Sequence, residues 1–125
     1  MKPALFLLAA LPFFSFECKN KTSAWLKGKV IRITCASTVV QVLDNKKIGD
    51  SSWADSMSTH QTYNNVFSVS NKCELPQTLK AGDEFWFTID SISKTQCIVC
   101  MMYDAPPQSK FSVKNFSSEP CRQNQ

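Results

Sequence analysis

The chain has 125 residues with a formal net charge of +4, and it contains six cysteines, nine phenylalanines and three tryptophans. Only three glycines are present, which excludes collagen-like and glycine-rich linker proteins. The basic residues are scattered, and Lys46-Lys47 is the only adjacent pair, so no nucleic-acid-binding arm is expected. This length suits one domain rather than two.

The N-terminus has the pattern of a secretory signal. Met1-Lys2 supplies a positive start, and residues 4–14 (ALFLLAALPFF) form an apolar run. The run is shorter than the roughly 17–25 residues that span a bilayer, as signal sequences are. We therefore predict a signal peptide over residues 1–17 and a mature protein that is secreted, periplasmic or attached to the cell envelope.

Two routes of processing fit the residues after the apolar run. Between Ala10 and Cys18, no two small residues have the spacing that an ordinary signal peptidase requires. A bacterial lipoprotein would instead be cut before Cys18 and carry acyl chains there, although Glu17 departs from the small residue usual before such a cysteine. Both routes stay open. Residues 18–26 then form a polar tether, 27–121 a single β domain and 122–125 a tail.

Strands are predicted through most of this domain. The clearest is Glu84–Asp90, where Phe85, Phe87 and Ile89 alternate with polar residues and Trp86. Such alternation, rich in aromatic and β-branched residues, is typical of half-buried strands. The six predicted strands cover residues 28–34, 38–43, 65–70, 84–90, 96–103 and 110–114.

The connection over residues 44–62 is too long and polar for a hairpin, and residues 51–57 (SSWADSM) predict a short helix within it, with Ser52 as its cap. Two strands, a long connection and further strands favour a single small all-β barrel of five to six strands, similar to the oligonucleotide/oligosaccharide-binding (OB) fold. The alternative is an immunoglobulin-like β-sandwich, although the usual Cys…Trp…Cys spacing is missing.

The cysteines are predicted to form disulfides, because the chain is expected to be exported. Cys97 and Cys100 form a CxxC pair inside a predicted strand, where about 10 Å would separate them. Disulfide Cα atoms lie within about 7 Å, so each cysteine of a regular strand needs a distant partner. A bulge or turn at Ile98-Val99 would instead allow Cys97 and Cys100 to pair with each other. We expect a long-range bridge involving Cys35 and Cys73, and one from Cys97 or Cys100 to Cys121.

The alternative is a small thiol-redox or zinc-binding protein centred on Cys97 and Cys100. A redox CxxC normally begins a helix, and a structural zinc site needs two further ligands. Cys35, Cys73 and His60 are the possible completions, but they are scattered and no second CxxC exists. We therefore predict no metal and no cofactor.

The sequence gives little support for enzymatic activity. His60 is the only histidine, and the chain contains none of the nucleophile-elbow, HExxH or P-loop motifs. We predict no catalytic residue and favour a protein that is not an enzyme.

A binding face is predicted around Trp86. Alternation places this indole on the polar side of its strand with Glu84 and Thr88, and Trp53 of the long connection is a candidate second wall. An exposed indole on a polar face is typical of contacts with a sugar, peptide or protein. The alternative is that another segment covers Trp86. Met101-Met102-Tyr103 is a second apolar patch, interpreted as core and strand end.

Several segments together resemble one group of proteins: GKVIRITC (28–35), TVVQVL (38–43), NVFSVSN (65–71), KAGDEF (80–85) and CIVCMMYDAPP (97–107). They are similar to small exported proteins of Bacteroidetes-type bacteria. The resemblance implies an envelope or secreted location and supplies no activity.

Together these features predict an exported, disulfide-stabilised β-barrel that acts as a binding or envelope-structural module. Its partner is expected to be an extracytoplasmic protein, peptide or glycan, with no nucleic acid, and with the membrane involved only through a lipid at Cys18.

Overall fold

A computed structural model describes residues 25–90 and 96–118 of the chain. The predicted signal peptide, most of the polar tether, Cys18, Cys121 and the tail lie outside the described residues. No helix in the described ranges is long and apolar enough to cross a membrane.

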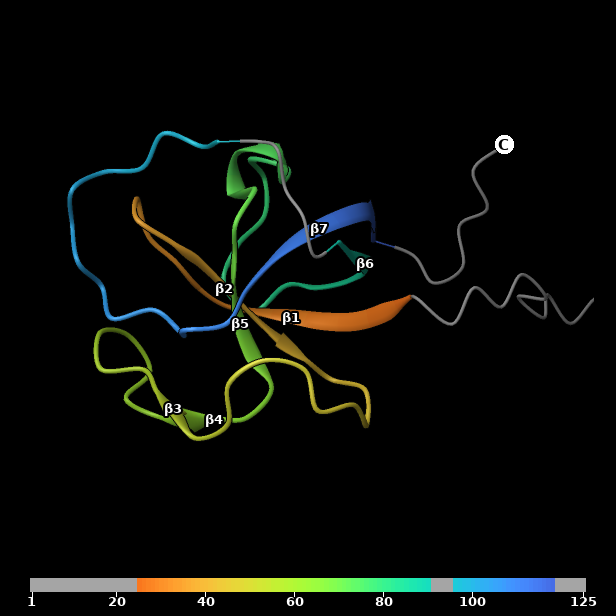
Figure 1. Cartoon of the computed structure of the whole chain (residues 1–125), viewed down its shortest axis with the longest axis horizontal. Coiled ribbons are helices and arrows are strands. Elements are labelled where there is room, and N and C mark those ends of the chain that lie inside the picture. The colour runs from red at the N-terminus through yellow and green to blue at the C-terminus, as the bar shows by residue number, and fades with distance from the viewer. Residues whose placement is uncertain (1–24, 91–95, 119–125) are drawn as a thin grey trace, which may run out of the picture.

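Five strands close into one barrel (Figure 1). Around the barrel the order is β1-β2-β5-β7-β6, and all neighbouring pairs are antiparallel except β5 and β7, which are parallel. The predicted OB-like barrel is therefore confirmed over a sandwich. The strands are β1 Leu26–Ile33, β2 Thr38–Val42, β5 Val66–Val69, β6 Glu84–Asp90 and β7 Lys110–Ser117.

The barrel interior combines aliphatic side chains, mostly valines, with three buried phenylalanines. Phe85 and Phe87 of β6 and Phe67 of β5 are buried, and the Phe67 and Phe87 ring centroids lie 5.9 Å apart. Tilted rings at this separation pack favourably. The alternation predicted for residues 84–90 thus supplies the core, and its bounds match β6.

A bulge in β1 creates a second apolar cluster outside the barrel. The pairing of β1 with β2 shifts between Val30 and Arg32, so that Arg32 lies opposite Val39. Ile31 and Val39 pack with Val66 in this outer cluster, whereas Val30 belongs to the interior. Such a bulge re-aims side chains, and here it leaves an apolar outer surface that needs cover.

That cover is a hairpin rather than the predicted helix. β3 (Trp53–Ala54) pairs with β4 (Thr62–Tyr63), and Trp53 packs into the outer cluster. The helix prediction for residues 51–57 was wrong because Asp55 organises a tight turn. Its carboxylate accepts the backbone N–H groups of Met57, Ser58 and Thr59.

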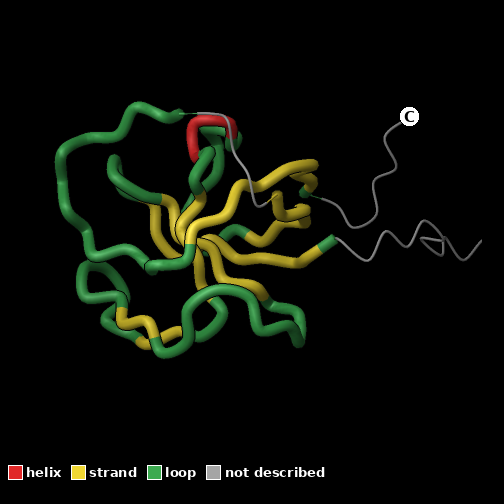
Figure 2. Tube along the Cα trace, in the orientation of Figure 1, coloured by secondary structure: helices red, strands yellow, loops and turns green. Residues whose placement is uncertain are grey.

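The strand predicted over residues 96–103 is also absent. These residues form an irregular segment that curves around one end of the barrel, drawn in light blue in Figure 1 and as loop in Figure 2. The physical reason is closure: five strands already complete the barrel, and a closed barrel offers no edge to a sixth. One turn of 3₁₀ helix, η1 (Lys72–Glu74), lies in the connection from β5 to β6.

Candidate functional site

The face around Trp86 is largely committed to contacts within the barrel. The Lys27 ammonium lies 5.8 Å from the centre of the half-buried Trp86 ring and 3.6 Å from Glu84. The Thr88 hydroxyl donates to the Lys114 carbonyl and accepts from the Asn115 amide. Glu84, Trp86 and Thr88 thus share one outer face of β6, and each has a partner there.

Trp53 does not form a second wall beside Trp86, so that expectation was wrong. It is buried beneath Arg32, whose guanidinium carbon lies 5.1 Å from the indole centre, and its ring centre is 6.3 Å from that of Tyr63. The indole N–H donates to the Ala105 carbonyl over 3.1 Å. The outer cluster formed at the β1 bulge requires this cover, which removes Trp53 from solvent.

Two disulfides tie the segment after residue 96 to separate loops. Cys35 pairs with Cys100, and Cys73 pairs with Cys97, with Cα separations of 5.5 and 5.6 Å. Cys97 and Cys100 thus have distant partners, as expected. The predicted pairings themselves were wrong, because each loop cysteine faces a different barrel connection. Cys121 lies outside the described residues.

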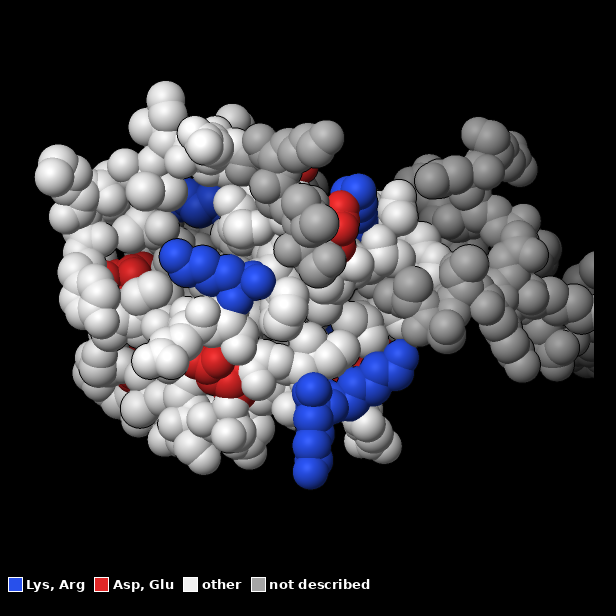
Figure 3. Space-filling view, in the orientation of Figure 1, with Lys and Arg blue, Asp and Glu red and all other residues white. Residues whose placement is uncertain are grey.

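Between and after these bridges the chain exposes a run of apolar side chains, which we call the apolar loop (residues 98–103). Ile98, Met101 and Tyr103 are 100, 105 and 86% exposed. Val99 and Met102 are exposed as well. No charged residue occurs from residue 96 to 103, and the left rim of the molecule in Figure 3, where Figure 1 places this loop, is mostly white.

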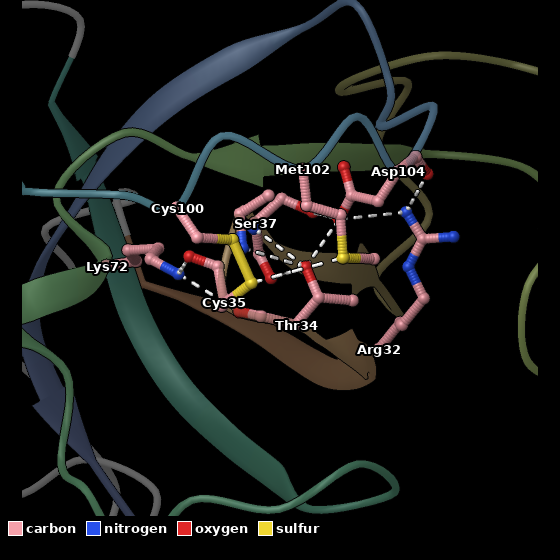
Figure 4. Close-up of a disulfide and its surroundings, with 9 residues drawn as sticks. Arg32, Thr34, Cys35, Ser37, Lys72, Cys100, Met102 and Asp104 are labelled. Carbon is pink, nitrogen blue, oxygen red and sulfur yellow. Dashed lines mark hydrogen bonds and ion pairs between the residues drawn. A yellow bond between two sulfur atoms is a disulfide. The ribbon is translucent and has the colours of Figure 1, made fainter.

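The middle of the apolar loop is held against the turn between β1 and β2. The Cys100 amide donates to the Cys35 carbonyl over 3.3 Å, beside the disulfide. Met102 Sδ lies 3.9 Å from Cys35 Sγ. On the other side, Lys72 Nζ donates to the Thr34 and Cys35 carbonyls at 3.0 and 2.8 Å. Figure 4 shows these groups converging on the bridge.

The end of the apolar loop is held by Asp104, which is buried. Its carboxylate accepts the hydroxyl groups of Thr34 and Ser37, both at 2.5 Å. The Arg32 guanidinium donates to the Asp104 main-chain oxygen at 2.6 Å and lies 3.5 Å from its carboxylate. A second carboxylate, Asp55, accepts from Arg32 at 2.8 Å. Among the described buried side-chain polar atoms, Arg32 Nε has no partner.

These carboxylates are held in the charged form. Burial raises the pKa of Asp55, but hydrogen bonds from Thr59, Met57 and Arg32 outweigh it and lower the pKa from 3.8 to about 2. Burial likewise opposes ionisation of Asp104, and the Ser37 and Thr34 hydroxyls and the Arg32 charge bring its pKa below the usual value. The attachment is therefore ionised at neutral pH.

The residues that follow Asp104 are also held in place, by the carboxylate of Asp50. Asp50 accepts the backbone N–H groups of Gln108 and Ser109 at 2.6 and 3.0 Å and the Ser109 hydroxyl at 2.6 Å. Burial raises the pKa of Asp50, and these hydrogen bonds lower it below its ordinary value. The chain is therefore fixed on both sides of the apolar loop.

Sequence reasoning missed the apolar loop as the exposed site. Residues 96–103 read as a strand, and Met101-Met102-Tyr103 as core. One signal was present: this run carries two cysteines that cannot pair with each other in a regular strand. In the structure the two bridges run to two different loops, and the segment pairs with no strand of the barrel.

The described residues contain no cluster of side chains that could hold a metal ion. His60 is exposed in the β3–β4 turn with φ of 56°. Across residues 25–90 and 96–118, no three His, Cys, Asp or Glu side chains are grouped to hold a metal ion.

No protein-family model matches this sequence, and a search of curated proteins finds no significant match. Any function assigned to the protein therefore depends on the chain's own residues.

Proposed function

We propose that this protein is an exported binding module that recognises a protein or peptide partner through the apolar loop. The observation that carries the proposal is the full exposure of Ile98 and Met101 on a segment tied by two disulfides. Contiguous exposed apolar side chains mark interaction sites in soluble proteins. Met and Tyr are enriched at protein interfaces, so a protein partner fits better than a glycan.

Rigidity supports the same proposal. A loop that is ordered before binding loses less conformational entropy when its partner arrives. Cys97, Cys100 and Asp104 hold the loop at three points spaced three and four residues apart. The side chains between them have little else to contact.

Site-specific photo-crosslinking tests the binding proposal. Tyr103→benzoylphenylalanine should label one protein of the producing cells' envelope or medium, and unmodified protein should compete while Met101→Lys does not. Met57→benzoylphenylalanine is the control, because Met57 is also exposed but lies in the β3–β4 turn. Binding through the loop would be refuted if both positions label partners equally. It would also be refuted if the Met101→Lys protein, added as competitor, abolishes labelling as the unmodified protein does.

Export is part of the proposal, with residues 1–17 as a signal peptide and Cys18 as a lipid attachment point in one variant of it. Disulfides are typical of proteins outside the cytoplasm, and the resemblance to small exported Bacteroidetes-type proteins agrees with this. The intact mass of protein from its natural host, alkylated without reduction, distinguishes the variants. Acyl chains on Cys18 indicate anchoring, whereas their absence indicates secretion.

The same mass tests the second candidate, a thiol-redox or zinc-binding protein centred on Cys97 and Cys100. That function requires both sulfurs as thiols, since the thiolate is the nucleophile and the ligand. In the structure each is oxidised with a different partner. Alkylated Cys97 and Cys100 would favour the second candidate, and unlabelled cysteines the binding module.

A further inference from the structure

Within the described residues, several backbone amides of the apolar loop have no hydrogen-bond acceptor. The amides of Ile98, Val99, Met101 and Tyr103 donate to no other residue within the described ranges, whereas the Cys100 amide bonds Cys35. A lipid surface would leave such groups unpaired at a cost. A partner whose own backbone runs alongside the loop would pair them, as a sheet edge pairs with a bound peptide.

The loop also restricts the shape of the cleft that receives it. Both of its ends continue into the barrel, through the Cys73–Cys97 bridge on one side and Asp104 on the other. It has no free terminus to offer. A recognition site that captures a terminal carboxylate or amine is therefore excluded, and the cleft must be open at both ends.

The side chains specify the pockets of that cleft. Met101 lies at a bend and is fully exposed, Tyr103 follows two residues later, and no charge occurs between residues 96 and 103. The side chains of a bound loop enter pockets of the cleft, so the pockets that receive Met101 and Tyr103 are apolar.

Backbone pairing, a cleft open at both ends and apolar pockets together describe how an endopeptidase holds a substrate chain. We propose that the apolar loop occupies the substrate cleft of an endopeptidase with apolar preference and inhibits it. This inference rests on the proposed function and names its partner class. Because the loop is fixed on both sides, it binds in one conformation and does not move through the cleft as a flexible substrate does.

Inhibition assays on the mature, oxidised chain test the inference. The probes are chymotrypsin, subtilisin, elastase and thermolysin, each acting on a small chromogenic or fluorogenic peptide. We expect competitive inhibition of at least one of them with an inhibition constant below about 10 μM. Residues 97–104 should stay uncut in the oxidised chain and be cut in the reduced, alkylated chain.

Matched variants locate the contact. Met101→Lys should weaken inhibition by at least about tenfold, the loss typical of a central contact residue. Met57→Lys makes the same change at an exposed methionine outside the loop and should leave inhibition unchanged. Inhibition that survives both Met101→Lys and Tyr103→Lys overturns the inference.

Two further outcomes also overturn it. One is rapid cleavage within residues 98–103 of the oxidised chain, and the other is no inhibition of any of the four enzymes at about 100 μM. These failures are separable from failure of the proposed function. If Tyr103→benzoylphenylalanine still labels a protein that is not a peptidase, binding through the loop stands and only the endopeptidase inference falls.

Discussion

The guanidinium of Arg32 holds the main-chain oxygen of Asp104, 72 residues later in the chain, at 2.6 Å. Arg32 belongs to β1 of the barrel, and Asp104 ends the apolar loop. One buried charged side chain therefore joins the rigid part of the fold to the segment that the molecule exposes. Hydrogen bonds to a charged group contribute about 1.5–3 kcal/mol, enough to fix where the loop ends.

Asp104→Asn tests this attachment. The amide keeps the size of the carboxylate but loses its charge and presents a donor toward Thr34 and Ser37, so we expect unfolding free energy to fall by about 2 kcal/mol. Denaturant melts measure that loss, and amide hydrogen exchange should rise at Thr34 and Ser37, whose amides are bonded within the turn that Asp104 contacts. Asp83→Asn is the control, because the Asp83 carboxylate is exposed and accepts the Lys80 amide in a turn. Equal losses in the two variants would contradict a special role for Asp104.

Stability should fall in acid. The pKa of Asp55 is lowered from 3.8 to about 2 in the folded protein, so the unfolded chain binds this proton first. The stabilisation is complete above the ordinary pKa and is lost as pH falls from about 4 to 2, a total of about 2 kcal/mol for this group. Urea melts of the wild type and Asp55→Asn across this range measure it. A difference between the two that does not shrink toward pH 2 would contradict the assignment.

The two disulfides should contribute unequally. Cys35–Cys100 spans 65 residues and Cys73–Cys97 spans 24. In the chain-entropy account, removing either pair costs about 2–4 kcal/mol and the longer closure costs about 1 kcal/mol more. Thermal or denaturant melts of Cys35→Ser/Cys100→Ser and Cys73→Ser/Cys97→Ser compare them directly. A larger loss in the second double variant would show that native contacts, rather than loop length, dominate.

Trp86 and Met101 should separate stability from binding. Trp86→Ala removes a half-buried indole and its contact with Lys27, so we expect about 1–3 kcal/mol less stability and unchanged partner labelling. Met101→Lys should leave stability unchanged and abolish partner labelling. Partner crosslinking combined with melts measures both. Loss of labelling in folded Trp86→Ala would instead support the polar face of β6 as the binding surface.

Gly49→Ala should disrupt the connection after β2. Gly49 has φ of 93°, and an added Cβ would collide with the backbone of Val66 in β5. Backbone atoms of a barrel strand cannot move aside cheaply, so we expect a loss of about 3 kcal/mol or more. Gly82→Ala is the control, because Gly82 has a similar φ of 95° but open space around its Cα. A similar loss in both would mean that backbone conformation, not the collision, sets the cost.

The local pattern of apolar and polar residues was enough to predict strands of the barrel. Residues 84–90 alternate so regularly that their strand, its bounds and its inward phenylalanines can be derived from the sequence, because a pleated strand with one buried face imposes a period of two. The CxxC spacing likewise implied that Cys97 and Cys100 do not pair in an extended chain. Both conclusions depend on residues a few positions apart.

Tertiary structure alone decided which apolar segment stays exposed. Residues 96–103 have strand-like composition, yet the closed barrel leaves them no edge to pair with, and bridges to Cys35 and Cys73 hold them outside it. The sequence made Trp53 a candidate second wall beside Trp86, but the β1 bulge creates an apolar patch that this indole covers. Composition records what a segment can bury, but which segment stays exposed depends on which surfaces the rest of the chain has already occupied.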